Sequence, residues 1–84
     1  MEEPPATTYL VNGAAIRTRR KDLGIDLAEC AAAAGISRPY LDQLELGHRR
    51  RMKPPTYHRL RTALRIEPSD RQLLAPPEEQ QRKE

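Results

Sequence analysis

The chain has 84 residues, which is enough for one small domain with a single hydrophobic core. It lacks Phe and Trp, and its apolar residues are mostly Ala, Leu and Ile, a composition that favours short packed helices over a sheet. The expected fold class is therefore all-α. The net charge is +3, and Cys30 is the only cysteine, so we expect no disulfide within the chain. We also expect no signal peptide and no membrane span, and so a cytoplasmic domain.

The two ends of the chain are polar and have no helical period. Residues 1–11 begin with paired Glu and Pro, and we expect them to form a flexible N-terminal arm. Residues 76–84 are charged enough to remain a solvated polar tail or to form a marginal helix. The folded domain is therefore predicted to span residues 12–75.

Two helices are predicted in the first part of this domain. Asn12 is placed to cap a helix that runs to about Leu23. Asp26 is placed to cap a second, alanine-rich helix that ends before Gly35. Cys30 falls on the apolar side of this second helix, so we expect it in the core.

The third helix follows after a very short connection. Ser37 is its expected N-cap, Pro39 falls in the first turn, and Gly47 ends the helix. Only Gly35 and Ile36 separate the second helix from that cap. Such a tight connection makes the two helices cross steeply, which is the helix-turn-helix geometry.

The remaining residues predict a loop and two more helices. The loop is expected over residues 48–55, and a fourth helix from about Thr56 to Arg65. A last short helix is predicted to open at Pro68 and to carry Leu73 and Leu74. The expected fold is thus a bundle of five helices.

Positive charge is concentrated in the middle of the chain. Residues 17–65 contain 12 Lys and Arg against 5 Asp and Glu, whereas the segments on both sides are net acidic. Clustered positive charge on a small domain is typical of a protein that binds a polyanion, usually nucleic acid. A basic face that is only solvated gives the same pattern, and the charge alone does not separate the two.

One run of residues carries a family resemblance. The run is AGISRPYLDQLELG at residues 34–47, which combines the glycine of the turn, the serine cap, two apolar anchors and a Glu-x-Gly ending. A basic run follows it, and Ile16, Arg17 and Arg20 precede it. Over about residues 13–75 the chain resembles the XRE, or Cro/cI-type, helix-turn-helix domains. The resemblance implies a compact five-helix fold of the lambda-repressor-like type.

The resemblance also implies that the third helix, residues 37–45, lies in the major groove of double-stranded DNA. Arg38 is the foremost candidate for base contact because two of its donors match O6 and N7 of guanine, the alternative being a phosphate contact. Gln43 could pair with adenine, and Asp42 could accept from cytosine or merely orient an arginine. The predicted DNA-binding residues of this helix are Ser37, Arg38, Pro39, Tyr40, Asp42 and Gln43.

The basic run after this helix is expected to contact the phosphate backbone or to enter the minor groove, unless it is simply solvated. Its members are Arg49, Arg50, Arg51 and Lys53. A different role is implied for Arg20 and Glu45, which pair in the family to hold the fold together.

Three positions depart from the family pattern. Leu27 stands where a phosphate-contacting glutamine is frequent, which weakens one expected DNA contact. Arg19 and Cys30 stand where larger apolar residues are common, which suggests a slightly smaller core or an extra surface charge.

The function expected from this pattern is sequence-specific regulation of transcription, with repression at an operator as the foremost form. A phage or plasmid regulator and an antitoxin that represses its own operon both fit, and tight binding would call for a homodimer. The alternative is a protein-interaction module for a toxin, an antirepressor or polymerase, and a third possibility is an architectural or recombination accessory role. The sequence predicts no enzyme, no cofactor and no metal site, because His48, His58 and Cys30 have no suitably spaced partners.

Overall fold

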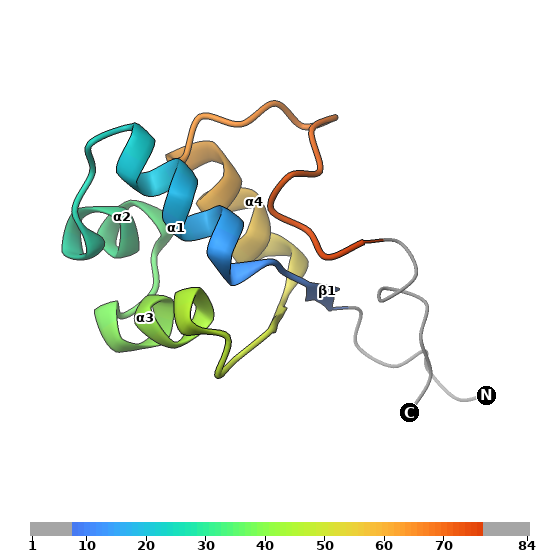
Figure 1. Cartoon of the computed structure of the whole chain (residues 1–84), viewed down its shortest axis with the longest axis horizontal. Coiled ribbons are helices and arrows are strands. Elements are labelled where there is room, and N and C mark those ends of the chain that lie inside the picture. The colour runs from blue at the N-terminus through green and yellow to red at the C-terminus, as the bar shows by residue number, and fades with distance from the viewer. Residues whose placement is uncertain (1–7, 77–84) are drawn as a thin grey trace.

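Four helices and a two-stranded sheet make up the fold in the computed structural model, which describes residues 8–76 (Figure 1). In chain order the elements are β1 (Tyr9–Leu10), α1 (Gly13–Asp22), α2 (Leu27–Ala34), α3 (Arg38–Leu46), β2 (Arg51–Met52) and α4 (Pro54–Ala63). The fold is mostly helical and broadly lambda-repressor-like, as predicted, but the described residues contain four helices and not five.

The helix boundaries follow from local chemistry that the sequence predicted. The side chains of Asn12, Asp26 and Ser37 each accept a hydrogen bond from the backbone N–H three residues further on, at 3.2, 2.7 and 3.2 Å. Gly35 and Gly47 adopt left-handed conformations, with φ of 71° and 86°, and end α2 and α3. These three N-caps and two C-caps are confirmed.

The core is formed by apolar side chains from all four helices. Fully buried members include Ile16, Leu41, Leu44, Leu60, Leu64 and Leu73. The small side chains of α2 let it pack closely against α4 and α3, and Cys30 is buried there as expected. Burial raises the pKa of the Cys30 thiol above its usual value, so the thiol stays protonated at neutral pH. None of the helices within residues 8–76 has both the length and the apolar character needed to cross a bilayer.

The prediction of a last helix near Leu73 and Leu74 is wrong. This segment forms turns and then an extended stretch in which Leu74 bridges Val11. The backbone N–H of Asn12 donates to the Leu73 carbonyl at 2.8 Å, and the backbone N–H of Ala75 donates to the Leu10 carbonyl at 2.9 Å. Because these backbone groups pair with the N-terminal segment, they are not available for a helix.

Residues 9–11, at the N-terminal side of the domain, also differ from the prediction. Tyr9 and Leu10 form β1, which pairs antiparallel with β2 inside the loop predicted for residues 48–55. Val11 is 1% exposed and belongs to the core. Residues 9–11 were predicted as part of a flexible arm and are instead paired on two sides; residues 1–7 of that arm and 77–84 of the tail lie outside the described residues.

Candidate nucleic-acid interface

The start of α3 is set by its cap and by the short turn before it. Ser37 Oγ accepts a hydrogen bond from the backbone N–H of Tyr40, and Arg38 and Pro39 occupy the first two helical positions. Proline is tolerated there because the N–H it lacks would have no partner inside the helix. With Gly35 left-handed, α2 and α3 form a helix-turn-helix pair (Figure 1).

One face of α3 is buried and the opposite face is open to solvent. Leu41 and Leu44 are completely buried, and Glu45 is only 8% exposed. The exposed residues recur at helical spacing, so their side chains share one side of the helix. This exposed face of α3 consists of Arg38, Pro39, Asp42, Gln43 and Leu46.

The basic loop, residues 48–53, is held next to α3 by the sheet. The backbone N–H of Val11 donates to the Arg50 carbonyl at 2.7 Å, and β1 pairs with Arg51 and Met52. Met52 is buried while Arg51 is exposed, as the alternation of a strand requires. The sheet therefore anchors the loop through its apolar residue and leaves its cations at the surface.

Side chains also connect the exposed face of α3 to the basic loop. Arg49 Nε donates to Gln43 Oε1 at 2.8 Å, and the Arg49 guanidinium carbon lies 5.6 Å from the centroid of the Tyr40 ring. The Tyr40 hydroxyl donates to the Arg51 carbonyl oxygen at 3.3 Å. Four of the predicted DNA-binding residues are thus joined in one network on one surface.

Four other predicted residues lie outside this hydrogen-bond network. Arg38 lies at the N-terminal end of α3, and its side chain makes no hydrogen bond or ion pair within residues 8–76. Asp42 borders a hollow beside α1 together with Arg17, away from the loop. Arg50 borders a different hollow, and Lys53 is the exposed residue directly before α4.

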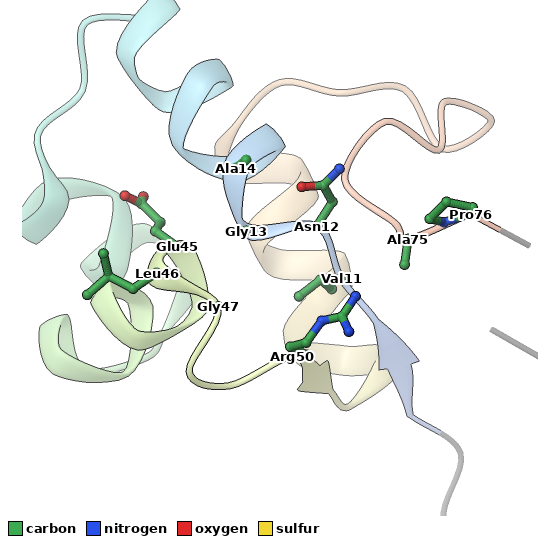
Figure 2. Close-up of a pocket in the computed structure, with 10 residues that line it drawn as sticks. All are labelled: Val11, Asn12, Gly13, Ala14, Glu45, Leu46, Gly47, Arg50, Ala75 and Pro76. Carbon is green, nitrogen blue, oxygen red and sulfur yellow. The ribbon is translucent and has the colours of Figure 1, made fainter. Parts of the chain in front are cut away.

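The hollow beside Arg50 has a volume of about 360 Å³ and lies between the start of α1 and the end of α3 (Figure 2). Gly13 packs against the carbonyls of Leu44 and Glu45, where a Cβ would overlap the Leu44 oxygen, so the two helices approach without a side chain between them. Among residues 8–76, the only carboxylate in its lining is Glu45. Within residues 8–76, no three His, Cys, Asp or Glu residues are grouped so as to hold a metal ion.

Glu45 is paired with Arg20, as the resemblance implied. Arg20 Nε and a terminal nitrogen donate to the two carboxylate oxygens at 2.7 and 3.0 Å, and the other terminal nitrogen donates to the Ile25 carbonyl at 3.0 Å. The hydrogen bond to Glu45 raises the pKa of Arg20 above its ordinary value despite the opposing effect of burial. The pair joins α1 to the end of α3 and so fixes the orientation of the exposed face of α3.

Three further arginines bond to backbone carbonyls at helix ends or in the segment just after one, and little in the sequence indicated this. Arg19, Arg59 and Arg61 each donate across an element boundary at 2.9, 3.0 and 2.8 Å. Their acceptors are the carbonyls of Leu64, Ala34 and Ile66, respectively. Arg19 also donates to the Arg65 carbonyl at 3.0 Å. The only indication in the sequence was Arg19, which stands at a position of the first helix where the family commonly has an apolar residue.

Thr8 is a supporting residue that sequence reasoning missed. Its hydroxyl accepts a hydrogen bond from the Arg51 guanidinium at 3.2 Å. The contact adds to the pairing of β1 with β2, so the segment before α1 helps to position a cation of the basic loop. A run of β-favouring residues, Thr8 to Val11, is the signal that could have indicated a strand here.

Comparisons with known proteins agree with this geometry. The helix-turn-helix domain family model matches residues 13–74. No curated protein matches the chain. Solved structures with the same fold include SinR, a master regulator for biofilm formation, in complex with DNA (25% identity, TM-score 0.62, covering 66% of this chain and 90% of SinR).

Two other solved structures are more similar in sequence. The restriction-modification controller protein C.AhdI from Aeromonas hydrophila is 32% identical, with a TM-score of 0.62 over 67% of this chain and 83% of that chain. ClgR, the clp gene regulator from C. glutamicum, is 34% identical, with a TM-score of 0.59 over 66% of this chain and 70% of that chain. The match to the family and the likeness to these regulators together show that the chain belongs to the helix-turn-helix domain family, of the XRE type.

Proposed function

We propose that the protein is a sequence-specific regulator of transcription that binds double-stranded DNA with α3 in the major groove. The observation that carries this proposal is the joining of the exposed face of α3 to the basic loop through the Arg49–Gln43 and Tyr40–Arg51 hydrogen bonds. A helix face that can contact base edges then lies directly beside cations that can contact phosphates. The regulators with the same fold, one of them in complex with DNA, support the proposal.

The two parts of this surface have different roles in the proposal. Arg38 and Gln43 contact base edges, and Arg38, which has no partner of its own within residues 8–76, reads a guanine. The cations of the basic loop neutralise phosphates and supply affinity that depends on salt but not on sequence. Ser37, Pro39, Tyr40 and Asp42 complete the α3 contacts.

We further propose repression by occupation of an operator as the mode of action. A single α3 buries a small area on DNA, so a homodimer on a two-fold site accounts best for tight binding. Operator binding places this action in the cytoplasm, on the nucleoid. A solution mass that remains monomeric both with and without operator DNA would contradict the dimer.

The test is selection from a randomised pool of DNA duplexes at two salt concentrations. We expect the intact chain to enrich a defined site, and Arg38→Ala to relax the preference at one position of that site. Arg65→Gln is the control, because it removes one positive charge, as Arg38→Ala does. Arg65 is exposed and follows the C-terminal end of α4, whereas Lys53 precedes its N-terminal end, so this variant should leave the selected site unchanged. If no duplex is retained even at low salt, the proposal is wrong.

Leu46 favours a second candidate function, binding to another protein. Its side chain is 59% exposed, which makes it the one large apolar residue that is strongly exposed among residues 8–76. A toxin, an antirepressor or polymerase could contact it at the end of α3. Binding of this kind would depend weakly on salt and would be lost in Leu46→Lys, whereas DNA binding falls steeply as salt rises.

A further inference from the structure

Gln43 is the one residue on the exposed face of α3 that is fixed by the basic loop through both its backbone and its side chain. Its carbonyl oxygen accepts hydrogen bonds from the backbone N–H groups of His48 and Arg49, at 2.9 and 3.2 Å. Its side-chain oxygen accepts from Arg49 Nε at 2.8 Å. The end of α3 and the basic loop are therefore joined directly at this residue.

The bond to Arg49 determines which way the Gln43 amide faces. An arginine side chain carries donors and no acceptor, so the Gln43 atom opposite Arg49 Nε must be the amide oxygen. The amide nitrogen, with its two donors, is then turned away from Arg49. Arg49 is itself held over the Tyr40 ring, which limits the range of positions that the pair can adopt.

This orientation changes the hydrogen bonds that Gln43 can make to a base. A glutamine reads adenine by donating to N7 and accepting from the N6 amine, so it needs its amide oxygen at the base edge. Here the oxygen lies beside a guanidinium, and an adenine amine approaching it would meet a cation that carries only donors. Guanine presents two acceptors, N7 and O6, which match the Gln43 amide nitrogen and the remaining Arg49 donors.

We infer that Arg49 determines base specificity by positioning Gln43, so that the Gln43–Arg49 pair selects guanine over adenine at the base pair that it faces. The inference rests on the proposed DNA-binding function. It assigns to Arg49 a role different from that of the other cations of the basic loop, which contact phosphates. It also replaces the adenine contact that the sequence suggested for Gln43.

The first experiment uses the full chain in the selection described above and compares Arg49→Ala, Gln43→Ala and Lys53→Ala. We expect the intact chain to prefer guanine to adenine by about tenfold at one position. Arg49→Ala frees the amide oxygen of Gln43 and should shift that position to adenine, while Gln43→Ala should lose the preference there. Lys53→Ala, the control for loss of charge, should weaken binding to all sequences and retain guanine.

A second measurement tests the hydrogen bond without DNA. In the NMR spectrum of the intact chain, we expect well-dispersed Gln43 side-chain amide resonances that move toward random-coil positions in Arg49→Ala but not in Lys53→Ala. The two proposals fail differently in these experiments. If the intact chain selects no site, the DNA-binding function itself is wrong; if it selects a site and Arg49→Ala keeps the same base at every position, only the role of Arg49 is wrong.

Discussion

Arginines serve two different purposes in two regions of this domain. At the helix ends, Arg19, Arg59 and Arg61 donate to backbone carbonyls, and Arg20 donates to both Glu45 and a carbonyl. On the surface formed by α3 and the basic loop, the arginines are exposed, and no ion pair to a carboxylate is found for Arg38, Arg49 or Arg51 within residues 8–76. A count of positive charges adds the two groups together, although the first group is bonded to carbonyl and carboxylate oxygens of the domain itself.

The helix-end arginines have a clear physical purpose. The last carbonyls of a helix have no partner within the helix and carry partial negative charge, so a guanidinium nearby satisfies and stabilises them. Four of the 12 basic residues between positions 17 and 65 donate to backbone carbonyls of this region: two acceptors, Ala34 and Leu64, end α2 and α4, and the other two, Ile25 and Ile66, lie in the segments just after α1 and α4. Substitutions in the two regions should therefore change different properties, namely stability in one and DNA binding in the other.

The largest effect is expected at the Arg20–Glu45 pair. Glu45→Ala leaves Arg20 without its carboxylate in a site where the two side chains are 3% and 11% exposed, and should cost roughly 3–5 kcal/mol of unfolding free energy. Urea denaturation measures this cost. Arg38→Ala is the matched variant on the exposed face of α3 and should change stability by less than about 0.5 kcal/mol. Equal losses in both variants would contradict the division into two regions.

A smaller loss is expected for a helix-end arginine that has no carboxylate partner. Arg61→Leu removes the donor to the Ile66 carbonyl, a buried hydrogen bond of 2.8 Å, and should cost about 1–3 kcal/mol. The melting temperature should fall accordingly. The exposed neighbour Arg65, changed to Gln, provides the comparison and should melt within a few degrees of the original chain. DNA affinity measured below the melting transition should be the same for both variants.

Substitutions in the basic loop should have the opposite effect. Arg51→Gln and Lys53→Gln should leave the unfolding free energy within about 0.5 kcal/mol of the original value. Each should reduce the slope of log affinity against log salt concentration by about 1, because one phosphate contact is lost. Titrations at several salt concentrations measure the slope. An unchanged slope would show that these cations do not contact phosphate.

The smallest effect on DNA binding is expected at the contact between Tyr40 and the loop. Tyr40→Phe keeps the ring next to Arg49 and removes only the exposed hydrogen bond to the Arg51 carbonyl, which should cost less than about 1 kcal/mol. Base preference should be unchanged, since the ring still holds Arg49. Selection with this variant checks the point, and a changed preference would mean that the hydroxyl itself contacts DNA.

The sequence predicted those parts of the fold that local chemistry determines. Asn12, Asp26 and Ser37 cap helices through atoms three residues away, and a glycine that ends a helix needs no distant partner. The helix-turn-helix pair and the buried position of Cys30 were predicted for the same reason, because periodicity and spacing are local.

The sheet and the helix-end arginines could not be predicted because they depend on residues far apart in the chain. The β-favouring run from Thr8 to Val11 is compatible with a strand, but so short an alternation does not identify one, and the partners of this run lie in β2 and at Leu74. The acceptor of Arg19 is 45 positions away. For the candidate interface, Arg38, Pro39, Asp42 and Gln43 were predicted to face DNA and are exposed, whereas the exposure of Leu46 was not predicted. The bond between Gln43 and Arg49 depends on how the loop returns to the helix.

The pairing of residues 9–11 with both the basic loop and residues 73–75 has a consequence for the order of folding. Thr8 and Arg51 are 43 positions apart, and the bridge from Val11 to Leu74 spans more of the chain still. Contacts between such distant residues form slowly, whereas the contacts between neighbouring helices form early. We therefore expect the basic loop to reach its final position late in folding, when both edges of the domain have come together.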